Sequence, residues 1–156
     1  RGICHLRFVE AGEAEAAQAE LQSEWPHAGW ARDDVMAQQL ATDLFSPFSQ
    51  PKPLNLLLRG TNFQIKVWEA LLRIPAGHAL CYSDLATMAA LPNAQRAVGT
   101  AMAHNAIAVL IPCHRVIRES GEAGLYRWGE ERKCAIISWE QSRRIAQMSR
   151  ETECAK

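Results

Sequence analysis

The chain has 156 residues, of which 48% are hydrophobic, enough for one sizeable core or for two small domains that share an interface. Its formal net charge is zero, but residues 1–60 carry 5 basic and 8 acidic side chains whereas residues 61–156 carry 12 and 9, so a polyanion would meet the second part. There is no apolar run long enough to cross a membrane, no signal peptide and no C-x-x-C pair among the five cysteines, so we expect a soluble cytoplasmic protein with reduced thiols rather than a disulfide framework or a zinc cluster.

The first part of the chain is predicted to be a small α/β domain over residues 1–59. Its predicted elements are a strand at 3–9, a helix at 13–24, a second helix with Met36, Leu40 and Leu44 on one apolar face, and a strand at 54–58. Asp33 or Asp34 can cap the second helix. Because the chain opens without methionine and a strand this near an end needs partners, we expect at least one preceding strand to have been removed.

Composition and charge change at Arg59-Gly60, where we place the boundary to a second domain over residues 60–156. Thr61 and Gln64 have the spacing of a capping box, in which each side chain satisfies a backbone donor of the other residue. The helix that follows is predicted to bury one large aromatic and aliphatic stripe: Phe63, Val67, Trp68, Leu71 and Leu72. Pro75 and Gly77 end this segment.

Two short helices joined by a turn predict a helix-turn-helix. Ser83 can cap a helix over 84–88, Leu91-Pro92 makes the turn, and Asn93 can cap a second helix over 94–104. The second helix consists mostly of Ala, Gly and Thr, and a glycine inside a helix costs about 1 kcal/mol relative to alanine. Close approach of another surface, either a packed helix or a nucleic-acid groove, would offset that cost.

The most distinctive stretch is Ile111-Pro112-Cys113-His114-Arg115-Val116. We expect a buried strand over 106–110 that Pro112 ends, so that Cys113 is presented at the edge of the strand. Beside an imidazole and a guanidinium the pKa of the thiol is expected to fall, and the thiolate is the nucleophilic form. A cysteine after an apolar run is more often a small core residue, so these residues alone do not decide between the two interpretations.

The last predicted element is a helix over 132–148, after a polar loop at 118–124. In this helix Glu140 follows Ile136 by four residues and Ile137 by three, which places its carboxylate on the apolar face. A buried carboxylate needs a partner, and a histidine next to a nucleophilic cysteine would suit it.

In this order the motifs resemble the O6-alkylguanine-DNA alkyltransferases, in particular the carboxy-terminal domain of bacterial Ada-type proteins. The resemblance covers residues 60 to about 145 and is carried by Gly60-Thr61-x-Phe63-Gln64-x-x-Val67-Trp68, Ile74-Pro75-x-Gly77, Tyr82-x-x-Leu85-Ala86, Arg96-Ala97-Val98-Gly99-x-Ala101-Met102, Asn105, the Pro-Cys-His-Arg-Val core, Tyr126-Arg127-Trp128-Gly129 and Glu140. It implies a ribonuclease-H-like α/β amino-terminal domain and a mostly helical, winged-helix-like catalytic domain.

The resemblance also implies a role for individual residues. Cys113 accepts the alkyl group, His114 and Glu140 activate it through a bound water, Tyr82 protonates the departing guanine and touches a phosphate, and Asn105 braces the turn before the active cysteine. Arg96 enters the duplex in place of the extruded base. The remaining DNA contacts are expected from Ala94, Gln95, Ala97, Gly99, Thr100 and Arg115, and the base pocket from Met102, Val116, Tyr126 and Arg127.

The implied activity is a methylated-DNA–protein-cysteine methyltransferase that acts on O6-alkylguanine, and on O4-alkylthymine, in double-stranded DNA after minor-groove binding and base flipping. The product is a thioether without a carbonyl for water to attack, so we expect one transfer per molecule. We expect no metal and no organic cofactor. We also expect a monomer that does not contact a membrane. An Ada-like regulatory domain linked before residue 1 is compatible with the resemblance.

Two positions depart from the family pattern: Cys81 stands where a hydroxyl residue is usual, and Leu125 replaces the glycine before Tyr126, which changes the pocket flap. Three other functions stay open at this point. An alkyltransferase-like lesion sensor lacks the cysteine, a helix-turn-helix regulator has no use for a Cys-His pair, and a cysteine hydrolase needs an oxyanion hole and commonly has its cysteine at a helix start.

Overall fold

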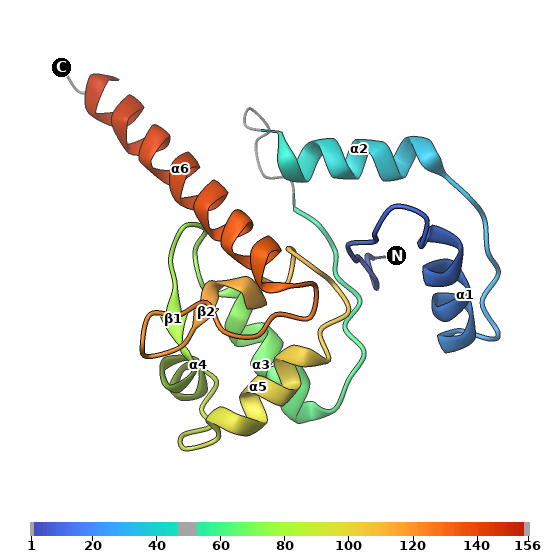
Figure 1. The fold of residues 1–156 in the computed structure, drawn as a ribbon, viewed down its shortest axis with the longest axis horizontal. Helices are drawn as coiled ribbons and strands as arrows, with labels where there is room; N and C mark the ends of the chain where they lie inside the picture. Colours follow the sequence, from blue (N-terminus) through green and yellow to red (C-terminus); the bar gives the residue numbers. More distant parts are fainter. Residues whose placement is uncertain (1, 47–52, 155–156) are drawn as a thin grey trace. The chain divides into compact units, whose positions relative to one another are not determined.

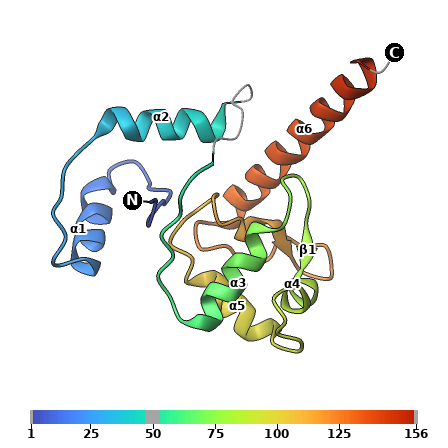
Figure 2. The same ribbon diagram turned by 180° about the vertical axis from the view of Figure 1, so that it is seen from behind.

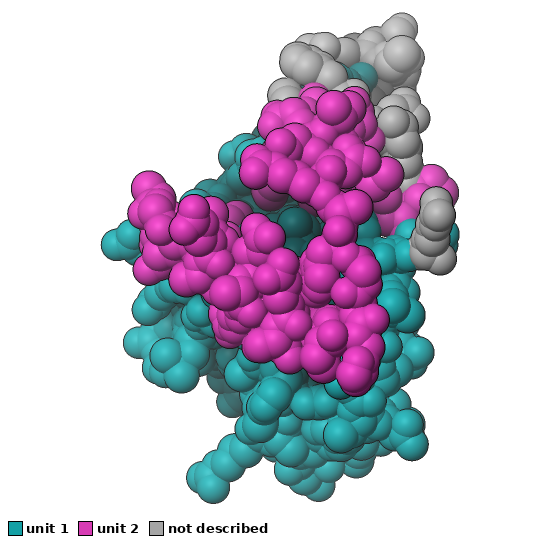
Figure 3. Space-filling model, turned by 90° about the vertical axis from the view of Figure 1, so that its right-hand side faces the viewer, with its two compact units in different colours: residues 1–7, 55–156 teal, residues 8–54 magenta. Residues whose placement is uncertain are grey.

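The computed structural model describes residues 2–46 and 53–154. The chain divides into two compact units: unit 1 comprises residues 1–7 and 55–156, and unit 2 comprises residues 8–54 (Figure 3). The segments at 1–7 and 55–59, which the sequence assigns to the amino-terminal domain, thus belong to the same unit as Cys113.

Unit 2 contains two helices, α1 (Ala14–Glu24) and α2 (Asp34–Phe45) (Figure 1). Both were predicted. The cap of α2 is Asp33, whose Oδ1 accepts a hydrogen bond of 2.9 Å from the backbone N–H of Met36. Ala17 is the buried residue of α1, and α2 buries none, so the described part of this unit offers little core of its own.

The three predicted strands at 3–9, 54–58 and 106–110 are wrong. Ile3 forms an isolated parallel bridge with Leu56, and Leu6 forms another with Ile107. Each bridge is too short to continue into a ladder, and Val109, with φ at +65°, turns the chain away from an extended path. The ribonuclease-H-like fold of the amino-terminal domain therefore stays a prediction.

The core of unit 1 is built on α3 (Asn62–Leu72), which packs against α4 (Tyr82–Met88) and α5 (Gln95–Ala103) (Figures 1 and 2). The predicted capping box of α3 is present: Thr61 N donates to Gln64 Oε1 at 2.9 Å, and Gln64 N donates to Thr61 Oγ1 at 3.2 Å. Trp68 Nε1 donates to the carbonyl of Ala101 at 3.0 Å, which joins α3 to α5 inside the core.

The helix-turn-helix is formed by α4 and α5, but neither predicted cap is right. Helix α4 begins two residues earlier than predicted, after Cys81, whose N–H and Sγ both face Asp84 Oδ2. Asn93 adopts φ of +65° in the turn, and Ala94 precedes the first turn of α5. Asparagine favours this left-handed turn conformation as readily as a helix cap, which explains the error.

The remaining elements of unit 1 surround the cysteine. Strand β1 (Leu80–Cys81) pairs in parallel with β2 (Val116–Ile117), and the 3-10 helix η1 (Cys113–Arg115) leads directly into β2. Helix α6 (Glu130–Cys154) packs against η1 and is longer at both ends than predicted. Within the ranges described, no helix has both the length and the apolar character needed to cross a membrane.

Candidate active site

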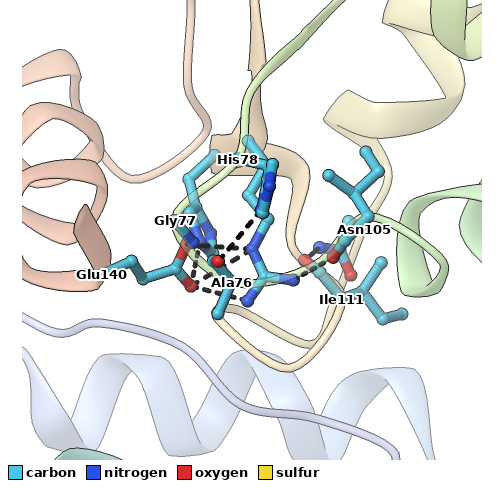
Figure 4. Close-up of polar contacts among 9 residues, drawn as sticks. Ala76, Gly77, His78, Asn105, Ile111 and Glu140 are labelled. Atoms are coloured by element: carbon cyan, nitrogen blue, oxygen red, sulfur yellow. Dashed lines mark hydrogen bonds and ion pairs between the residues drawn. The ribbon is translucent and has the colours of Figure 1, made fainter. Parts of the chain in front are cut away.

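Cys113 lies at the start of η1 rather than at a strand edge, and its side chain is 3% exposed. The side chain of Asn105 makes three polar contacts with this segment. Its Nδ2 donates to the carbonyl of Ile111 at 3.0 Å and lies 3.3 Å from Cys113 Sγ, while its Oδ1 accepts from the N–H of Ile107 at 2.8 Å. Figure 4 shows Asn105 beside Ile111. The sulfur is therefore held in one position by a fully buried amide.

Glu140 is the centre of a buried polar cluster and is itself 4% exposed. Its Oε1 lies 3.0 Å from Nε2 of the fully buried His114, and its Oε2 accepts from the N–H of Gly77 at 3.1 Å (Figure 4). The predicted pairing of His114 with Glu140 is confirmed. Because a carboxylate can only accept, Nε2 donates, and the neutral ring is left with Nδ1 as an acceptor.

The third partner of Glu140 is Arg115, which we predicted to contact DNA. Its Nη2 lies 2.6 Å from Glu140 Oε1, its Nε lies 2.9 Å from Oε2, and its Nη1 bonds to the carbonyl of Ile74. The bidentate contact uses the planar geometry of the guanidinium and leaves the side chain 15% exposed. Arg115 therefore braces the cluster, and its assignment as a DNA contact stays a prediction.

The charges of the site follow from burial and from these bonds. Burial raises the pKa of Cys113, and the hydrogen bond from Asn105 and the charge of Lys133 only partly oppose that rise. The lowered pKa expected from the flanking cations is therefore wrong, because burial dominates and Arg115 is turned toward Glu140. For Glu140, burial acts upward as well, but hydrogen bonds from His114, Arg115 and Gly77 outweigh it and lower the pKa to about 2.

Tyr82 occupies the first turn of α4 and faces α5. A Cβ added to Gly99 would lie 3.6 Å from Cε1 of Tyr82, an ordinary van der Waals contact, so the ring lies directly against this part of α5. Burial raises the pKa of Tyr82 and the positive charge of Arg118 only partly opposes that rise, so the phenol is protonated at neutral pH. The tyrosine can thus act as a proton donor within the electrostatic reach of the cysteine.

Four of the residues of α5 that were predicted to contact DNA are exposed to solvent. Val98, Ala101 and Met102 are buried, whereas the outward face carries Gln95, Arg96, Ala97 and Thr100. Ala94 and Gly99 are half-buried. The long side chains of the exposed face, Gln95 and Arg96, thus lie in its first turn, and the residues that follow are small.

Three of the predicted pocket residues, Val116, Tyr126 and Arg127, follow Cys113 in the chain. Tyr126 packs edge-on against His114, with ring centroids 6.5 Å apart, and against Trp128 at 5.2 Å. Its Oη is buried and has no hydrogen-bond partner within the described part of the chain. Arg127 reaches back to the carbonyl of Asn105 at 3.1 Å, and the fully buried Val116 lies in β2, opposite Leu80.

Comparison with known proteins decides the family. A model of the DNA-binding domain of 6-O-methylguanine DNA methyltransferases matches residues 62–142, just over half of the chain. The chain belongs to the 6-O-methylguanine DNA methyltransferase family. The match includes α3, α4, α5, η1 and the Glu140 cluster.

Relatives within this methyltransferase family agree. The chain is 41% identical over 141 residues to the bifunctional transcriptional activator/DNA repair enzyme Ada of Escherichia coli, a match that covers 88% of this chain and 39% of Ada. It is 47% identical over 96 residues to the methylated-DNA--protein-cysteine methyltransferase of Mycobacterium tuberculosis H37Rv, covering 62% of this chain and 58% of that protein. The chain thus spans less than two thirds of either relative.

Solved structures of the methyltransferase family have a similar fold. The crystal structure of the M. tuberculosis O6-methylguanine methyltransferase has a TM-score of 0.70 and 36% identity, over 90% of this chain and 81% of that one. The M. tuberculosis OGT crystallised with DNA has a TM-score of 0.64 and 44% identity, over 69% of this chain and 66% of that one. The mixed helical architecture with a small two-stranded sheet therefore matches the family.

Sequence reasoning missed one buried charged residue in the core of unit 1. Lys133 on α6 is fully buried, and its Nζ donates to the carbonyl of Ala123. Burial lowers the pKa of its ammonium group. A signal was available in the sequence, because Lys133 precedes Ile136 by three residues and Glu140 by seven, which puts all three on one face of the helix.

Proposed function

We propose that this protein repairs DNA by moving the alkyl group of O6-alkylguanine, and of O4-alkylthymine, onto Cys113. The observation that carries the proposal is a cysteine held 3.3 Å from Asn105 Nδ2 beside a fully buried His114–Glu140 pair, in a chain that belongs to the 6-O-methylguanine DNA methyltransferase family. The E. coli and M. tuberculosis relatives are named as a DNA repair enzyme and a methyltransferase of methylated DNA.

The geometry suits removal of the thiol proton. Glu140 is ionised above pH 2 and accepts from His114 Nε2, so the acceptor Nδ1 is free for the proton of Cys113. This Nδ1 is buried and has no hydrogen-bond partner among the residues that the structure describes. We propose that it receives the proton through a bound water, and that Glu140 stabilises the imidazolium formed.

The thiolate then attacks the alkyl carbon. A carbon–sulfur bond forms as the carbon–oxygen bond to the base breaks, and the electron pair of that bond passes to the purine. Tyr82 supplies a proton to the departing guanine, for which its raised pKa makes it suitable at neutral pH. The resulting thioether offers water no carbonyl to attack, so each molecule reacts once.

Access to the alkyl group requires the nucleotide to leave the duplex, because O6 is otherwise hidden in the base stack. We propose that the exposed face of α5 enters the minor groove and that Arg96 fills the gap left by the extruded base. The small side chains of Ala97 and Thr100 allow the backbone to come close. Cys113, the cluster and α5 all belong to unit 1, which supports action as a monomer.

The test is the intact mass of the protein after incubation with a duplex containing O6-methylguanine. We expect the wild type to gain the mass of one methyl group, on Cys113, and the Cys113→Ala variant to bind the same duplex without gaining mass. A lesion sensor would bind with no mass gain in either protein, and that outcome would reject the proposal.

A further inference from the structure

A tight turn follows α3 at residues 75–78, and we call it the Gly77 turn. It is closed by a hydrogen bond of 3.2 Å from His78 N to the carbonyl of Pro75. Gly77 is its third residue, with φ of +73°, a conformation that a type II turn requires at this position and that glycine adopts without strain. The closing bond uses neither the N–H nor the carbonyl of the buried Gly77, so both groups need other partners.

Both partners of Gly77 come from α6. Gly77 N donates to Glu140 Oε2 at 3.1 Å, as Figure 4 shows, and the carbonyl of Gly77 accepts from Arg144 Nη1 at 3.3 Å. Residues four apart lie on the same face of a helix, so Glu140 and Arg144 reach the turn from one side. The turn that binds the catalytic carboxylate is thus also bound by an arginine outside the Glu140 cluster.

The stem of Arg144 packs against Gly77 as well. A Cβ added to Gly77 would lie 3.1 Å from both Cβ and Cδ of Arg144, and 3.1 Å from the backbone oxygen of Glu140. These distances are shorter than an ordinary van der Waals contact, so α6 comes this close to the turn only because Gly77 has no side chain. The packing and the guanidinium hydrogen bond together fix the turn against α6.

The place of the turn matters to Glu140 because Gly77 N is one of two donors to Oε2. The other is Arg115 Nε at 2.9 Å, while Oε1 lies 3.0 Å from His114 Nε2. A carboxylate with donors on both oxygens cannot rotate without losing one of them, so these bonds set the direction in which it accepts from His114. If the turn moved away, Oε2 would lose its backbone donor and the carboxylate would be held less firmly.

We propose that Arg144 is a positioning residue: it holds the Gly77 turn against α6, and the turn holds the carboxylate of Glu140 in place. The inference rests on the proposed function, in which this carboxylate supports His114 as the imidazole takes the proton of Cys113. Arg144 acts through the turn and contacts none of the reacting atoms. The alternative is a merely structural role, in which Arg144 stabilises the fold without affecting Glu140.

Substitutions at Arg144 separate the two roles. Arg144→Lys keeps a long stem with a donor, whereas Arg144→Met keeps a long stem and removes the donor. Arg150→Met is the matched control, because Arg150 is an exposed arginine further along α6. The readouts are hydrogen exchange of the Gly77 amide, measured against the other amides of unit 1, the rate at which iodoacetamide alkylates Cys113 at pH 7, and urea denaturation.

In Arg144→Met we expect the Gly77 amide to exchange about tenfold faster, and Cys113 to be alkylated a few-fold more slowly, because the carboxylate is held less firmly. Arg144→Lys should restore most of both values, and Arg150→Met should match the wild type. A merely structural role would lower the urea midpoint and leave the relative exchange of Gly77 and the alkylation rate unchanged. That result would overturn the proposal.

A second pair of variants tests the contact from the side of the turn. Gly77→Ala places a methyl group against Arg144 and the backbone of Glu140. Gly12→Ala is the matched control, because Gly12 is also the third residue of a turn, at residues 10–13, and has φ of +89° with nothing within 4 Å of an added Cβ. The two variants share the backbone strain, and only the first disturbs the contact with α6.

The pKa of Glu140 is the readout for this pair. Hydrogen bonds from His114, Arg115 and Gly77 outweigh burial and lower it to about 2 in the wild type. Loss of the Gly77 donor should raise this pKa toward 4.5 in Gly77→Ala, as measured by NMR titration of the isotope-labelled carboxyl group. Gly12→Ala should keep the wild-type value. An equal Glu140 pKa in the two variants would overturn the proposal.

Two features keep the outcome clear. Arg144 is exposed, so its variants test the proposal even if Gly77→Ala does not fold. None of these measurements uses DNA, so failure of the proposed repair activity would be seen separately, as absence of a methyl adduct on Cys113.

Discussion

The Glu140 cluster and the outward face of α5 lie in the same unit but differ in charge and in exposure to solvent. The cluster joins the charged groups of Glu140 and Arg115 to the imidazole of His114 in the interior of the unit. The face of α5 carries almost no charge apart from Arg96, and it is open to solvent. The contrast teaches that chemistry and recognition can be separated: substitutions in the cluster should change stability and thiol activation together, whereas substitutions on α5 should change only the response to DNA.

The largest effect is expected from Glu140→Gln, which breaks the cluster. The neutral amide leaves the partly buried Arg115 without its counter-ion, and its NH2 group cannot accept the hydrogen bonds that Oε2 takes from Gly77 N–H and Arg115 Nε. Loss of one partner of a buried ion pair costs about 3–5 kcal/mol, so urea denaturation should show a decrease of that size. Transfer from methylated duplex should fall as well. If Glu140→Gln were as stable as the wild type, the Glu140 cluster would not stabilise the fold as we describe.

Acid should act on the same group. The folded pKa of Glu140 is about 2, below its ordinary value of 4.5, so its contribution to stability is complete above pH 4.5 and is lost as the pH falls toward 2. The shift corresponds to about 3 kcal/mol. The free energy of unfolding of the wild type should therefore decrease over this range more steeply than that of Glu140→Gln, and parallel curves for the two proteins would contradict the assignment.

Arg96→Ala should affect the other side of the comparison. Without the long side chain nothing fills the gap left by an extruded base, so transfer from duplex should slow by about tenfold or more, since base flipping costs a few kcal/mol. Stability and iodoacetamide alkylation of Cys113 should stay at wild-type levels. Arg32→Ala, which removes an exposed arginine from unit 2, is the control and should leave transfer unchanged. If Cys113 in Arg96→Ala reacted more slowly with iodoacetamide, α5 would affect thiol activation as well as recognition of DNA, which would contradict their separation.

The smallest effect is expected from Ala97→Leu. Both residues favour helix, and the side chain is exposed, so melting should be unaffected. The added bulk keeps the α5 backbone from coming close in a groove, and duplex binding should weaken a few-fold in a fluorescence anisotropy titration. Tighter binding would indicate that α5 meets DNA through apolar contacts rather than through its small residues.

Local patterns predicted much of unit 1. The capping box at Thr61 and Gln64, the helix pair α4 and α5, and the pairing of His114 with Glu140 followed from spacing and from the resemblance together. The strand predictions were wrong because an apolar run does not show how many residues of a neighbouring segment pair with it. Here each pairing is a single bridge. Boundaries of α4 and α5 shifted because Ser and Asn have more than one favourable place near a turn.

The charge state of the site could not be predicted from local sequence patterns. Adjacency in sequence suggested that Arg115 would activate Cys113, whereas the fold turns its guanidinium toward Glu140. Burial also reversed the expected direction of the pKa of Cys113. Both outcomes depend on which elements pack around η1, and no single segment contains that information.

The most direct test of the account is a titration of the protein with duplex whose O6-methylguanine carries a radioactive methyl group, followed by peptide mapping. The account predicts that label in the protein rises to one methyl per molecule and stops, with all of it on Cys113. Methyl release beyond one equivalent, or label on another residue, would contradict it.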